Sequence, residues 1–91
     1  MGPPDSRYGN PVKQIRIQYF ALLREQAGCS EQTVMTEAAT PSQLYSELQR
    51  QHGFTLPEGL VKVAIEDEFA PMSAPLPDNV SIVFIPPVAG G

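Results

Sequence analysis

Hydrophobic and polar residues alternate along residues 13–20, with the period of a strand that buries one face. The two faces of this predicted strand carry Ile15, Ile17 and Tyr19 on one side, and Arg16, Gln18 and Phe20 on the other. The spacing of apolar residues changes to that of a helix over residues 21–27, and Gly28 is expected to end this helix. Residues 32–36 predict a second short strand, paired with the first in a loose hairpin.

A longer helix is predicted over residues 41–52. Thr40 can cap its first turn, Pro41 suits the first helical position, and Gln43 would complete a capping box. Gly53 fits the left-handed residue that commonly follows the last turn. The sequence therefore marks both ends of this helix.

The last third of the chain favours strands. Residues 61–65 predict a strand, residues 66–68 a polar turn, and residues 69–70 a short return strand. Residues 80–85 (VSIVFI) are β-branched or aromatic nearly throughout and apolar on both faces, which predicts a central place in a mixed sheet. Pro86 and Pro87 should end that strand, because proline has no N–H for the ladder.

The order of these elements, with one main helix to pack across a mixed sheet, indicates an α+β fold of the β-grasp, ubiquitin-like class. A chain of 91 residues is expected to form one domain. Residues 1–12 hold three of the ten prolines, two glycines and no apolar period. They are expected to be a disordered arm or a non-native extension, and residues 13–91 to be the folded domain with its C-terminal tail.

Composition narrows the classes of function. The net charge is −4 and no run of five basic residues occurs, so nucleic acid is not an expected partner. The single cysteine excludes an internal disulfide and any four-cysteine metal site built from this chain alone. The apolar runs are too short to cross a bilayer, and no signal-peptide pattern is present, so a cytoplasmic protein with no membrane partner is expected. The small size favours a carrier or subunit over a self-sufficient enzyme.

The residues after the last predicted strand are the strongest candidates for chemistry. Gly90 and Gly91 have no Cβ, so their backbone can approach another protein closely. Adenylation by ATP would turn the carboxylate of Gly91 into a mixed anhydride that a sulfur nucleophile can attack. Pro86 and Pro87 should hold the base of this tail extended, away from the sheet. The alternative is a frayed tail that happens to end in two glycines.

Two motifs link the chain to a family. They are IQYFALLRE at residues 17–25, followed by Gly28, and VFIPPVAGG at residues 83–91. Together they resemble the opening and the ending of the molybdopterin synthase small subunit (MoaD type). Residues 63–65, Pro75-Leu76 and Asp78 match the middle of that family more loosely, and Glu66 departs from it, since relatives usually have Asn there. The resemblance covers residues 14–91.

The resemblance implies a sulfur carrier that is not catalytic alone. A partner enzyme would use ATP to adenylate Gly91, and a sulfur donor protein would supply the sulfur of a C-terminal thiocarboxylate. The tail would then enter the large synthase subunit and donate sulfur to cyclic pyranopterin monophosphate in molybdenum cofactor biosynthesis. The inserted residues would be Pro86, Pro87, Val88, Ala89, Gly90 and Gly91. The family assembles as a heterotetramer of two small and two large chains, and this chain would bind no cofactor itself.

A partner surface is expected near the tail. The strand alternation places Phe20 and Ile85 away from the core, where they could form one exposed apolar patch. The family resemblance adds Phe69 as a contact position and Arg24 as a polar neighbour. The alternative is that a helix or loop covers these residues.

Other readings stay open at this point. The chain could carry sulfur for thiamine or for tRNA thiolation, modify other proteins through Gly91, or be an interaction domain with an idle tail. Cys29 lacks a neighbouring CxxC partner and His52 stands alone at a helix end, so both are expected to be incidental. The acidic run at residues 66–68 is expected to be solvated rather than metal-binding.

Overall fold

The computed structural model of the chain describes residues 12–87, and the predicted arm and most of the tail lie outside them. Eight elements follow one another along the described chain. They are β1 (Lys13–Tyr19), α2 (Ala21–Ala27), β2 (Glu31–Thr36), α3 (Pro41–His52), the 3₁₀ helix η1 (Glu58–Leu60), β3 (Lys62–Ile65), β4 (Glu68–Ala70) and β5 (Val80–Ile85).

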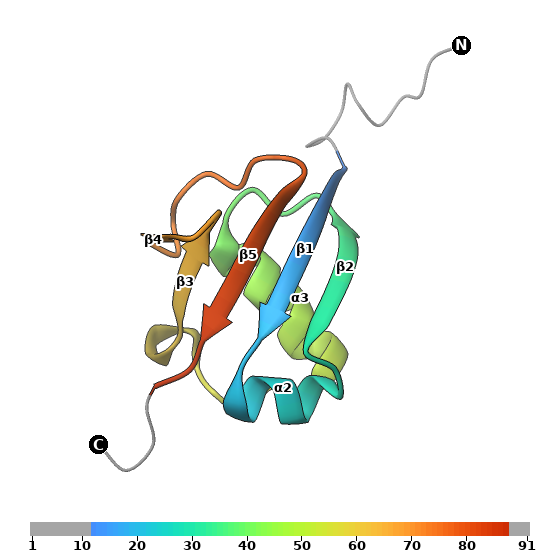
Figure 1. Cartoon of the computed structure of the whole chain (residues 1–91), viewed down its shortest axis with the longest axis vertical. Helices are drawn as coiled ribbons and strands as arrows, with labels where there is room; N and C mark the ends of the chain where they lie inside the picture. The colour runs from blue at the N-terminus through green and yellow to red at the C-terminus, as the bar shows by residue number, and fades with distance from the viewer. Residues whose placement is uncertain (1–11, 88–91) are drawn as a thin grey trace.

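The strands form one mixed sheet in the order β2-β1-β5-β3-β4. β5 pairs in parallel with β1 and antiparallel with β3, and the two outer pairs, β1 with β2 and β3 with β4, are antiparallel. Figure 1 shows α3 lying across one face of this sheet, and α2 at the end where β1 and β5 finish. This arrangement confirms the predicted β-grasp class and the central place of the last strand.

The buried face of the sheet and α3 form the core. Ile15, Ile17 and Tyr19 of β1 point into it, as the alternation predicts, together with Ile82 and Phe84 of β5. The facing residues of α3 are Leu44, Tyr45 and Leu48. Because side chains alternate along a strand, the other face of β5 carries Val83 and Ile85.

Both predicted helix ends are present in α3, with one difference. The Thr40 hydroxyl accepts from the backbone N–H of Gln43 at 3.2 Å, and Gly53 adopts the left-handed conformation with φ 74°. The Gln43 side chain, however, accepts from the N–H of Ala39 at 2.8 Å rather than from that of Thr40. The cap therefore provides hydrogen-bond acceptors for one N–H of the helix and for one N–H of the preceding loop.

The predicted bounds differ from the observed ones at a few strand ends. Phe20 is not the last residue of β1 but the cap residue before α2, because the chain turns sharply at Ala21, which has φ 51°. The turn between β3 and β4 is also shorter than predicted, since Glu68 already pairs with Ile65. The 3₁₀ helix η1 was not predicted.

The short β3–β4 turn carries unfavourable backbone geometry. Its two central residues, Glu66 and Asp67, have φ values of 51° and 70°, as in the hairpin turns that favour Asn-Gly. Glu66 has a second role, because its carboxylate accepts from the N–H of Ser81 at 2.6 Å and its N–H donates to the carbonyl of Ser81 at 2.9 Å. Asp67 is exposed, so it is the residue at which strain can be relieved without losing these bonds.

We predict that Asp67→Gly stabilises the fold by about 0.5 kcal/mol, because glycine removes the left-handed strain but also gains freedom in the unfolded chain. For a domain of this size the melting temperature should rise by roughly 2–4 °C. Asp67→Ala is the matched control and should lower the melting temperature, since alanine tolerates the left-handed region less well than aspartate. Equal melting temperatures for the two variants would contradict the prediction.

Two buried tyrosines should make the fold sensitive to alkali. Burial raises the pKa of Tyr19 above its ordinary value of 10.0, and the negative charge of the Cys29 thiolate adds to that rise. Burial, followed by the charge of Glu58, also raises the pKa of Tyr45. In the unfolded chain both phenols ionise near pH 10, so their contribution to folding is fully present below that pH and is lost as the pH rises above it.

The free energy of unfolding, measured in urea at pH values below and above 10, should therefore fall on the alkaline side. Tyr19→Phe loses the hydrogen bond from the phenol to Gln32, at 2.7 Å, and should cost about 1 kcal/mol at neutral pH. The same variant should lose less stability than the parent as the pH rises. If the free energy of unfolding of the parent chain does not change above pH 10, folding does not raise the pKa of these phenols.

Candidate functional site

The central strand leads directly into the predicted tail. β5 ends at Ile85, the next residue, Pro86, is buried, and Pro87 is exposed. The root of the tail is therefore anchored in the body at one proline and leaves it at the next. Val88, Ala89, Gly90 and Gly91 lie outside the described residues, so their predicted role in insertion and chemistry stays a prediction.

An apolar groove of about 650 Å³ opens beside this root. Three parts of the chain form its apolar walls. Phe20 directly precedes α2 and Leu22 lies in it, Leu56 comes from the loop ahead of η1, and Ile85, Pro86 and Pro87 come from the end of β5 and the residues after it. Ala21 completes the lining, and Glu25 is the charged residue among those that line the groove. Phe20 is 44% exposed and Leu22 is 38% exposed, which is high for large apolar side chains.

The predicted partner residues fall into two groups. Phe20 and Ile85 line the same groove, so the structure brings these two together. Phe69 is 77% exposed on β4 and lies at a separate hollow of about 490 Å³ with Lys62 and Pro71. Arg24 is exposed on α2 but does not line the groove.

Phe69 and Ile85 nevertheless share one face of the sheet. Phe69 lies opposite Ala64, Ala64 lies opposite Val83, and Val83 is two residues before Ile85, so all four side chains point to the side away from α3. Among the described residues no helix covers this face, which is the near face in Figure 1. An apolar band therefore crosses the open face from β4 to the tail root.

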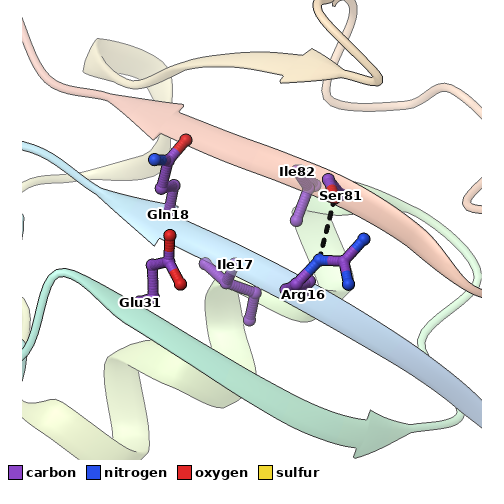
Figure 2. A pocket seen from close by; sticks show the side chains of 6 residues that line it. All are labelled: Arg16, Ile17, Gln18, Glu31, Ser81 and Ile82. Carbon is purple, nitrogen blue, oxygen red and sulfur yellow. Dashed lines mark hydrogen bonds between the residues drawn. The ribbon is translucent and has the colours of Figure 1, made fainter.

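The same face is polar at its other end. A depression of about 110 Å³ lies there. Figure 2 shows Gln18 and Glu31 at one end of it and Arg16 beside Ser81 at the other. The Arg16 Nε donates to the Ser81 hydroxyl at 3.1 Å. A polar hollow of this size holds a few waters, whereas the groove at the tail root has room for whole side chains.

The sequence did not single out Leu22, Leu56 or Glu25. Two leucines in succession, Leu22 and Leu23, do signal that one of them faces outward on a short amphipathic helix. Leu23 is the buried one. Leu56 carries no such signal, because its position depends on hydrogen bonds from α3.

The other candidates have structural roles. The His52 Nε2 lies 2.8 Å from the Oε1 of Gln32, which also accepts from Tyr19, and the imidazole packs against the rings of Tyr19 and Phe54. Cys29 is a half-buried free thiol beside the core. Within residues 12–87 no three His, Cys, Asp or Glu side chains are grouped as metal ligands would be. In the same range no helix has the length and apolar character to span a bilayer.

Comparison with known proteins supports the likeness of the sequence motifs. The model of the ThiS family matches residues 17–91. Comparison with curated proteins gives no significant match.

Several solved structures share the fold. Small archaeal modifier protein 1 from Methanosarcina acetivorans has a TM-score of 0.72 at 20% identity, over 90% of this chain and 100% of that chain. A molybdopterin converting factor subunit 1 from Pyrococcus furiosus has a TM-score of 0.69 at 24% identity, over 84% and 99%. A complex of subunits 1 and 2 of the molybdopterin-converting factor from Helicobacter pylori gives 0.56 at 24% identity, over 86% and 99%.

The matched residues make up most of the chain and include both motifs, the strand β5 and the root of the tail. The chain therefore belongs to the ThiS family, and it shares the ubiquitin-like β-grasp fold of these solved structures.

Proposed function

We propose that this chain is the small subunit of a molybdopterin synthase. A partner enzyme uses ATP to adenylate the carboxylate of Gly91, with release of pyrophosphate. Sulfide supplied by a donor protein then attacks the carbonyl carbon and displaces AMP, which leaves a thiocarboxylate. The thiocarboxylate donates its sulfur to cyclic pyranopterin monophosphate inside the large subunit. The observation that carries the proposal is the family match, which extends to Gly91. The central strand β5 leads directly into this matched tail through Pro86, which is buried.

The geometry of the root supports delivery of a chain end into another protein. Pro86 is buried and Pro87 is exposed, so the chain emerges from the body between these two residues. Proline locks its own φ, which limits the directions in which the following residues can leave the sheet. Gly90 and Gly91 add no side-chain bulk that a narrow channel would have to admit.

The proposed partners follow from the same chemistry. They are the adenylating enzyme, the sulfur donor protein and the large synthase subunit, with which we expect a heterotetramer of two small and two large chains. The Helicobacter pylori protein of this fold is found as a complex of subunits 1 and 2, which supports a protein partner of this kind. We propose that Phe20, Arg24, Phe69 and Ile85 contribute to these contacts, and that ATP is held by the adenylating enzyme rather than by this chain.

Two other uses of the same tail remain as alternatives. Sulfur could go to thiamine or to tRNA thiolation, since the matched family model is that of ThiS. The chain could also modify other proteins through Gly91, and the likeness in fold to a small archaeal modifier protein favours including this in the test. All three uses begin with adenylation. Protein modification separates from the others at the next step, whereas the sulfur-transfer uses share the thiocarboxylate and differ only in the acceptor of its sulfur.

Incubation of the full chain with ATP, the adenylating enzyme and a sulfur source should produce a chain in which one sulfur replaces one oxygen. Intact mass spectrometry measures this change, and fragmentation should place it on Gly91. The charged chain, mixed with the large subunit and cyclic pyranopterin monophosphate, should then yield molybdopterin and return to its original mass.

The control is a chain that lacks Gly91, which should keep its melting temperature but form no molybdopterin. A chain that gains sulfur but gives no molybdopterin would favour another pathway, and covalent adducts with other proteins would favour the modifier reading. Molybdopterin formation by the truncated chain would refute the role of Gly91.

The apolar band on the open face should contribute to binding of the large subunit. We predict that Phe69→Ser weakens this binding by about tenfold, the loss typical of a large aromatic contact. Met35→Ser is the matched control, because Met35 is 65% exposed on the edge strand β2, far from the tail root. Titration calorimetry measures both affinities, and equal losses in the two variants would remove Phe69 from the interface.

A further inference from the structure

The groove beside the tail root has walls that are held in place by hydrogen bonds. On one side, the side chain of Gln26 in α2 makes two bonds with Thr55: its Nε2 donates to the Thr55 hydroxyl at 3.0 Å, and its Oε1 accepts from the Thr55 N–H at 3.2 Å. These paired bonds tie α2 to the loop that carries Leu56. They therefore limit changes in the width of the groove between Leu22 and Leu56.

The opposite wall is fixed from α3. The carbonyl of Leu56 accepts from the Tyr45 hydroxyl at 2.7 Å and from the Gln49 Nε2 at 3.2 Å. Tyr45 is fully buried and stacks on Phe54, so this anchor belongs to the core. The groove is thus preformed by bonds to two helices, a condition under which binding loses little conformational entropy.

Its lining gives it a defined chemical preference. Phe20 and Leu22 leave about two fifths of their surface exposed to water. Exposed apolar surface is unfavourable in water, so covering it with an apolar side chain would favour binding. Glu25 is the charged residue at the lining, and the chain as a whole carries a net charge of −4. Such a groove matches an apolar side chain with a lysine or arginine next to it.

The location of the groove favours as its occupant a protein that takes up the tail. Pro86 and Pro87 form part of its wall and are also the root of the tail. A protein that takes up the residues after Pro87 must come close to Pro87, which is itself part of this wall. It therefore meets the groove at the same time as the tail.

We propose that the groove between α2 and Leu56 receives an apolar side chain of the protein that takes up the tail, with a basic residue of that protein placed at Glu25. This inference rests on the proposed function, and its partner is the large synthase subunit. The contact is separate from the chemistry of Gly91, because it fixes the body of the carrier rather than its end. It is also separate from the Phe69 end of the open face, which lies on β4.

The test compares the full chain with three variants in calorimetric titrations against the large subunit. Leu22→Gln keeps a good helix former at an exposed position and should weaken binding by about tenfold. Met35→Gln makes the same kind of change at an exposed residue of β2 and should change the affinity by less than about twofold. Melting temperatures of the free chains show whether each variant is folded.

Glu25→Lys tests the charged edge of the groove and does not depend on the leucine. The parent's affinity should fall as salt is added, and the lysine variant should bind more weakly at low salt with a smaller salt dependence. A lysine variant with the parent's affinity and salt response would overturn the basic flank of the proposal. Parent-like binding by a folded Leu22→Gln chain would overturn the groove contact itself.

Other occupants of the groove would give different results. A dimer of the free chain that Leu22→Gln dissociates, seen by sedimentation, would assign the groove to a second copy and overturn the proposal. Changes in the amide resonances of Leu22 and Leu56 on removal of residues 88–91 would assign it to the chain's own tail, with the same consequence. If the parent chain does not bind the large subunit at all, the proposed function fails. If the parent binds and Leu22→Gln binds equally tightly, only the groove contact fails.

Discussion

The pairing of β5 with β1 on one side and β3 on the other is the constraint on which the rest of the structure depends. Its register sets Phe84 opposite both Tyr19 and Val63, and Ile85 opposite Lys62. A slip by one residue would turn Ile82 and Phe84 out of the core, so this register is strongly specified. The same register fixes where the chain leaves the sheet, and so it places the root of the tail between the open face and α2.

This constraint separates the work of the body from that of the tail. In the body, the phenol of Tyr19 and the imidazole of His52 share the Oε1 of Gln32, so these polar groups serve the packing between the sheet and the end of α3. Under the proposed function, the reacting group belongs to the chain end, and ATP bound by another protein activates it. The body then has two tasks, which are to hold the root in a fixed position and to present surfaces that a partner recognises.

Local patterns predict the parts of the fold that local forces decide. The alternation along β1, the Thr40 cap and the apolar strand β5 each reflect contacts or propensities of neighbouring residues, and each was predicted with nearly the observed bounds. The groove was not predicted, because its walls depend on bonds between distant residues. The Oε1 of Gln26 accepts a hydrogen bond from Thr55, which is 29 positions away, and the periodicity of the sequence does not predict such a pair.

The composition of the tail explains why a carrier of this kind needs apolar contacts at its root. Gly90 and Gly91 have no side chains, so the segment best suited to enter a narrow channel offers the fewest groups for affinity. Binding energy at protein interfaces comes mainly from a few large side chains in well-packed positions. In this chain such residues lie on the folded body, at Phe20 and Leu22 beside the root and at Phe69 on β4. The thin chain end that we propose to react therefore depends on the apolar surface at its base, because the end can be delivered to a partner's site only if that surface binds the partner.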